Sequence, residues 1–295
     1  MIPRFLPGLI ALAAAFPAAH AQASRDWSTT VAITGVMQSE ADLGGGGQMK
    51  ADSLGVRAGI ATALTPTFRA GLALNAQTVD YRFSGVAQTP WSDIERIGLS
   101  APMSQGYAGG WVALFNPSID LIREKGAASS DSLVWGATLA GMKVFAIDQR
   151  IGFGAAVYRR FEKTVAFPLL VIDWNLGQGW SLANPLTAGP TGPAGLELRY
   201  QLAPRWQAGL GAAYRSLAFR LDEGQAGRVG AVGIESGIPV FARASYALTQ
   251  DVSLDFVAGV VTMGRLELQN AGGDKLSKRD LGTSALGGIS LRGSF

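Results

Sequence analysis

Apolar and polar residues alternate along most of this chain with a period of two. In residues 281–295 one parity is almost wholly apolar, and the residues between are small or polar. Alternate side chains of a β-strand face opposite ways, so such a run predicts a strand with one apolar face. The same alternation recurs at 54–64, 194–202 and 252–268. The pattern therefore predicts an all-β protein.

The predicted strands favour a transmembrane barrel over a soluble β-sandwich. They run to roughly 9–16 residues, whereas strands of soluble proteins average about 5–6. Their second face is rich in glycine and alanine rather than in lysine and glutamate. Such a face suits a crowded barrel interior behind an apolar wall that contacts lipid.

The connections alternate between short turns and longer polar segments. Six short turns are expected at 65–67, 104–106, 148–149, 177–179, 203–205 and 249–251. Seven longer segments are expected at 38–50, 84–92, 123–131, 160–164, 185–194, 222–227 and 270–280. Together they predict an antiparallel transmembrane barrel of 14 strands, with 12 as the alternative if a hairpin is lost in 93–122 or 165–184. Barrels of this type place short turns in the periplasm and longer loops outside.

The first 21 residues read as a cleaved signal peptide. Arg4 precedes an apolar stretch from Phe5 to Phe16, and Ala19-His20-Ala21 fits the cleavage rule of small residues. Residues 22–295 are then one barrel domain, expected in the bacterial outer membrane and in contact with its lipid. The single histidine, His20, would leave with the peptide.

The last strand ends on an aromatic residue, Phe295, with apolar residues at alternate positions before it. This ending resembles the C-terminal signature of bacterial outer-membrane barrels. The resemblance implies that Phe295 is an assembly signal and that the barrel insertion machinery is a partner during assembly.

A second resemblance covers residues 167–200, which include Pro168-Leu-Leu-Val-Ile-Asp173-Trp174 and Gly195-Leu-Glu197-Leu-Arg-Tyr200. This stretch is similar to a family of uncharacterised outer-membrane β-barrel proteins. The family has no established activity, so the resemblance implies fold and location alone.

Catalytic and cofactor chemistry is poorly represented. The chain has no cysteine, and the mature chain would have no histidine, so serine–histidine and aspartate–histidine hydrolysis are excluded. Metal binding would rest on carboxylates alone. The net charge of +3 is mild and not clustered, which does not support nucleic-acid binding. We therefore expect no enzyme, no cofactor and no metal.

Charged residues at strand positions are expected to line the lumen, because a cation facing lipid at the midplane costs about 2–4 kcal/mol. By parity the lumen-lining candidates are Arg57, Arg69, Asp173, Glu197, Arg199, Arg215, Glu235, Arg243, Asp255, Arg265, Glu267 and Arg292.

Two functions fit this lumen. One is a passive channel or transport protein for small solutes, with a mild preference for anions. The alternative is a structural or surface-interaction barrel with an occluded lumen and loops that bind a partner. In a wet pore, Glu197→Ala should cost about 0–1 kcal/mol, as for exposed ion pairs. In a dry lumen the cost should be about 3–5 kcal/mol. The wet pore is the prediction; the solute, gating and oligomeric state stay open.

Overall fold

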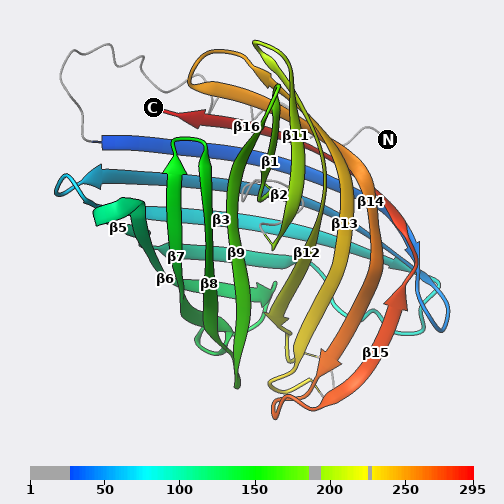
Figure 1. The fold of residues 1–295 in the computed structure, drawn as a ribbon. Coiled ribbons are helices and arrows are strands. Elements are labelled where there is room, and N and C mark those ends of the chain that lie inside the picture. The colour runs from blue at the N-terminus through cyan, green and yellow to red at the C-terminus, as the bar shows by residue number, and fades with distance from the viewer. Residues whose placement is uncertain (1–26, 186–193, 225–227) are drawn as a thin grey trace.

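The computed structural model describes residues 27–185, 194–224 and 228–295, which form one closed antiparallel β-barrel (Figure 1). The predicted signal peptide, 1–21, and most of the predicted loop 185–194 lie outside the described residues. No helix in the described part of the chain is long and apolar enough to cross a membrane.

The strands are mostly long. Their bounds are β1 Trp27–Asp42, β2 Gln48–Ala63, β3 Phe68–Ser84, β4 Ile94–Ser100, β5 Met103–Tyr107, β6 Trp111–Glu124, β7 Leu133–Ala146, β8 Gln149–Arg160, β9 Lys163–Gly177, β10 Trp180–Ala183, β11 Ala194–Ala203, β12 Trp206–Arg220, β13 Val232–Ala247, β14 Val252–Gln269, β15 Lys275–Leu281 and β16 Ser284–Ser294. Two 3-10 turns, Ala108–Gly110 and Ser130–Ser132, lie between them.

Sixteen segments make fourteen positions in the described ring, because two positions are filled by broken strands. β4 and β5 both lie between β3 and β6. β15 and β16 pair with successive halves of β14. The pairing of β16 with β1 closes the ring, and Phe295 extends it through backbone hydrogen bonds in both directions with Thr29. The prediction of a 14-stranded barrel is confirmed.

Four predicted connections have wrong bounds. The expected loops 38–50 and 160–164 shrink to 43–47 and 161–162, because the flanking strands continue further than the alternation indicated. Residues 104–106 lie inside β5, and the turn follows at 108–110, where Gly109 and Gly110 adopt positive φ of 72° and 77°. Glycine takes this conformation without the steric cost that a Cβ brings. The expected loop 270–280 is shorter, because β15 begins at Lys275 and pairs with the end of β14.

A bulge in β14 overturns the parity expected for its second half. Between the pairs Ser236–Arg265 and Ile238–Thr262, β14 has one residue more than β13, and Met263 has a φ of 52°. An extra residue shifts every later side chain to the other face. Arg265 and Glu267 therefore face outward, which corrects the expectation that they line the lumen.

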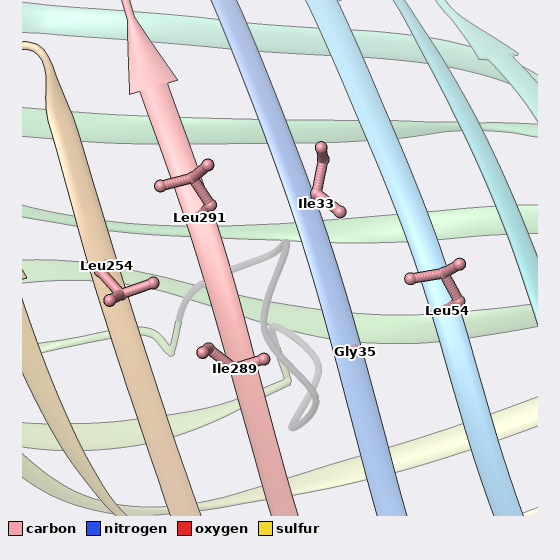
Figure 2. Close-up of a pocket in the computed structure, with 6 residues that line it drawn as sticks. All are labelled: Ile33, Gly35, Leu54, Leu254, Ile289 and Leu291. Carbon is pink, nitrogen blue, oxygen red and sulfur yellow. The ribbon is translucent and has the colours of Figure 1, made fainter. Parts of the chain in front are cut away.

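The outer face carries an apolar belt. Its exposed side chains include Leu54, Ile60, Leu74, Ile97, Phe115, Leu139, Phe153, Leu210, Val240 and Ile289. Aromatic pairs Trp180–Tyr200 and Trp206–Tyr246 lie beside the short turns, as in the girdle of a membrane barrel. Figure 2 shows the belt at the closure of the ring, where Gly35 leaves a depression of about 190 Å³ among apolar side chains.

Candidate functional site: the barrel interior

Ten of the twelve candidate residues lie on the inner face, as the strand register shows. They are Arg57, Arg69, Asp173, Glu197, Arg199, Arg215, Glu235, Arg243, Asp255 and Arg292. Their role as a pore lining stays a prediction.

Five of these residues form one network along the wall of β11, β13, β14 and β16. Glu197 accepts hydrogen bonds from Arg199 Nε at 3.0 Å and from Arg243 Nε at 2.6 Å. Arg243 continues to Asp255 Oδ1 at 3.1 Å, and Arg292 Nε reaches Asp255 Oδ2 at 2.5 Å. The side chains of Glu197, Arg243 and Asp255 are exposed by 0%, 4% and 1%. The centre of the network is therefore shielded from water, whereas Arg199 and Arg292 at its ends are 17% and 30% exposed.

A glycine makes room for this network. A Cβ at Gly209, which faces Arg243 across the β12–β13 ladder, would lie 2.1 Å from Glu197 Oε1. Because position 209 has no side chain, the Glu197 carboxylate lies flat against the wall between two arginines. The charged side chains of this network therefore pair along one side of the barrel, and their ion pairs do not extend across the lumen.

A second network lies nearer the loop end. Arg215 donates to Glu235 Oε1 at 2.8 Å and to Gln38 Oε1 at 2.5 Å, and the Tyr81 hydroxyl donates to the same Glu235 carboxylate. On the other side of the barrel, Arg96 Nε donates to Asp120 Oδ1 at 2.8 Å.

Above the second network the lumen is filled by an aromatic plug. Trp91, from the segment between β3 and β4, is 1% exposed and packs against Tyr81, Phe83 and Phe219. The centroids of Trp91 and Phe219 are 5.1 Å apart with the rings nearly perpendicular, a favoured aromatic geometry. Buried apolar side chains from β2, β4, β6, β7, β14 and β15 complete the cluster. We call this cluster the plug.

A polar latch holds the plug segment in place. Glu124, at the end of β6, accepts hydrogen bonds from the Ser92 N–H at 2.7 Å and from the Asp222 N–H at 2.9 Å. Arg228 lies 3.8 Å from the same carboxylate and donates to the Thr89 carbonyl at 2.8 Å. Two connections, between β3 and β4 and between β12 and β13, are thereby tied to one strand end.

The turn half of the barrel is open by contrast. Arg57 and Arg69 face inward and are nevertheless exposed, and the salt bridges of the described residues include neither. A polar cavity of about 410 Å³ opens at this end. Its lining includes Asp173, Ser181, Arg199, Gln201 and Gln207. Exposed side chains on an inner wall mean that the space they face is not filled by protein.

Part of the inner wall of β6 to β9 is apolar, where a lumen wall is commonly polar. Half-buried or buried inward side chains here include Leu114, Ala140, Met142, Val165, Phe167, Leu169 and Val171. The inner wall of β6 to β9 therefore combines an apolar patch with the charged residues Asp120, Arg150, Arg160 and Asp173.

Periodicity alone did not reveal the plug. Trp91 stands in a segment expected to be a polar loop, and its burial depends on rings from β3 and β12 that lie far away in sequence. Arg160 was also assigned to a loop, whereas it ends β8 on the inner face. Within the described residues, no cluster of three or more acidic side chains could hold a metal ion.

A comparison with protein-family models finds no match, and a comparison with curated proteins finds none at a significant level. Solved structures resemble the chain over most of its length, at low sequence identity. A COG4313 outer membrane channel from Pseudomonas putida F1 has 11% identity and a TM-score of 0.48, with 93% of this chain and 97% of the other covered.

Two further structures extend the comparison. The toluene transporter TodX from P. putida has 10% identity and a TM-score of 0.42, with coverage of 92% and 91%. A KdgM porin in complex with oligogalacturonate has 10% identity and a TM-score of 0.35, with coverage of 88% and 97%. At this level of similarity, the function of the chain has to be inferred from its own residues.

Proposed function

We propose that the protein is an outer-membrane channel for the passive passage of small solutes, closed at its loop end by the plug. The observation that carries this proposal is the exposure of Arg57 and Arg69 on the inner wall. An interior that served stability alone would pair or bury these cations. Exposed inward arginines are expected instead where water and solutes occupy the lumen.

The apolar belt supports location in a membrane, and the two ends of the barrel support an orientation. Short turns and the open cavity are at one end, which we place in the periplasm. The plug and the longer connections are at the other end, which we place at the cell surface. Passage then requires the plug segment to move away from the lumen, because Trp91 and its neighbours fill the path.

A mild preference for anions is the second part of the proposal. Arg57 and Arg69 carry charge that is not neutralised by the salt bridges of the described chain, whereas the inward carboxylates Asp173, Glu197, Glu235 and Asp255 each have an arginine partner. Uncompensated charge of one sign in a narrow passage raises the local concentration of counter-ions.

The plug also favours the rival function, a structural barrel with an occluded lumen. The two hypotheses differ in whether ions cross. We therefore propose recordings in planar bilayers under a KCl gradient, where the reversal potential reports the ratio of anion to cation permeability. The wild-type protein should show openings with a reversal potential shifted toward that of chloride. Arg57→Gln combined with Arg69→Gln should move it toward zero. A complete absence of current in every variant would support the structural barrel.

A matched control is Arg205→Gln, which removes an arginine from a turn and leaves the inner wall intact. It should keep the wild-type reversal potential. If the double variant also keeps that potential, the two arginines do not set selectivity and the anion preference is wrong.

A further inference from the structure

Among the described residues, the β9–β10 ladder covers only the turn half of β9, next to the apolar patch on the inner wall. β10 pairs with β9 at residues 173–177 only, and Asn184 adds backbone and side-chain hydrogen bonds at Ile172 and Leu170. Beyond this point the loop half of β9 pairs, within the described residues, with β8 alone. Its inward side chains Val165, Phe167 and Leu169 are half-buried. The part of this apolar strip that stays exposed is unfavourable by about 25 cal/mol per Å² unless something apolar covers it.

A cation without an anion stands at the loop end of this strip. Arg160 is half-buried on the inner face, with its guanidinium carbon 5.7 Å from the centre of the Phe167 ring. No salt bridge of the described residues includes it, and the nearby Glu162 is bonded to Arg220 at 2.6 Å. Tyr214 and a second cation, Arg96, act on it electrostatically, and Lys163 stands opposite it in the β8–β9 ladder. Residues 186–193 and 225–227 contain no acidic side chain.

We propose that the inner face of β9 and Arg160 together bind a small amphipathic anion, an apolar molecule that carries one carboxylate. The carboxylate would accept hydrogen bonds from the Arg160 guanidinium, which matches it in a bidentate geometry. The apolar body would cover Phe167, Val165 and Leu169. From residue 165 to 169 the strip extends over roughly 13 Å at about 3.3 Å per residue, which sets the longest body that it can cover.

This inference rests on the proposed function, since the ligand class would be a solute of the channel. Arg160 differs from Arg57 and Arg69 in its surroundings. Those two are exposed and act on any anion through a screened charge, whereas Arg160 lies on an apolar surface. A charge-assisted hydrogen bond is stronger where water is excluded. Arg160 should therefore discriminate between ligands that have the same apolar body and differ in charge.

The test uses the full barrel in lipid nanodiscs and a matched pair of probes, 4-(4-fluorophenyl)butyrate and 4-(4-fluorophenyl)butanol. Fluorine NMR line widths give the dissociation constant of each, and empty nanodiscs give the background. The wild type should bind the carboxylate at least about tenfold more tightly than the alcohol. Arg160→Gln should weaken carboxylate binding by at least about tenfold, as expected for the loss of a hydrogen bond to a charged group, and leave alcohol binding unchanged. Phe167→Ala should weaken the binding of both probes.

The control is Arg159→Gln, which removes the same charge from the neighbouring position, where the side chain is exposed and faces outward opposite Trp135. It should bind both probes as the wild type does. Heat-modifiable mobility establishes that each variant is folded. If Arg160→Gln does not fold, the comparison of the two probes on wild-type protein still tests whether the site recognises the carboxylate. Equal binding of the two probes, or equal losses in Arg159→Gln and Arg160→Gln, would overturn the proposal. Probe binding is measured at equilibrium and does not require ions to cross the membrane. The binding proposal can therefore hold when no current is recorded, and the channel proposal can hold when no probe binds.

Discussion

Glu197 holds two guanidinium groups with one carboxylate that has no exposed surface. Its environment is therefore that of a buried ion pair, although it lies in a barrel with a wet half. Removal of one member of a buried pair leaves an uncompensated charge and costs about 3–5 kcal/mol. We predict a loss of this size in the free energy of unfolding for Glu197→Ala, measured by denaturant titration in detergent. This replaces the small loss expected from the sequence.

The control at the residue scale is Asp173→Ala. Asp173 pairs with Arg150 at 2.5 Å on the same inner wall, but the two side chains are 35% and 44% exposed. Solvent screens this pair, so its loss should cost about 0–1 kcal/mol. Similar losses in the two variants would show that Glu197 is hydrated and that the wall network is not shielded.

At the scale of elements, the last residue closes the ring. Phe295 donates its N–H to the Thr29 carbonyl at 2.8 Å and accepts from the Thr29 N–H at 2.7 Å, while its ring lies over Gly293. We predict that deletion of Phe295 lowers the amount of folded barrel in cells, measured as the heat-modifiable fraction in outer-membrane preparations. The control is Leu276→Ala in β15, an exposed residue away from the closure, which should leave the folded fraction unchanged. Normal accumulation of the truncated protein would show that the terminal aromatic is not needed for assembly.

The elements also show which features the sequence could predict. Alternation in β2 and β11 gives the inner and outer faces directly, because β2 pairs with β3 without a register shift and β11 pairs regularly with β12 as far as Gln201. In β14 alternation fails after Met263, since a bulge is set by local backbone geometry and leaves no mark on the pattern of polar and apolar residues. The break between β4 and β5 does not change the number of strand positions in the ring, because both segments lie between β3 and β6.

At the scale of the whole molecule, strand number, closure and inner charges follow from the alternation, whereas occlusion does not. The plug forms because Trp91, Tyr81 and Phe219 meet across the lumen, and no local pattern encodes contacts between residues so distant in sequence. The latch on Glu124 is non-local for the same reason: it joins residues of three separate segments. The result is a barrel with an open end and a closed end.

The most direct test of a channel closed by the plug is single-channel recording of Trp91→Ala in planar bilayers. Replacement of a buried tryptophan by alanine removes about 3–5 kcal/mol of packing, so the open state should gain population by at least about tenfold. We predict a marked rise in open probability over the wild type, with no change for Trp135→Ala, a tryptophan that is 59% exposed on the outer face. Trp91→Ala protein that is folded but conducts no more than the wild type would contradict the account.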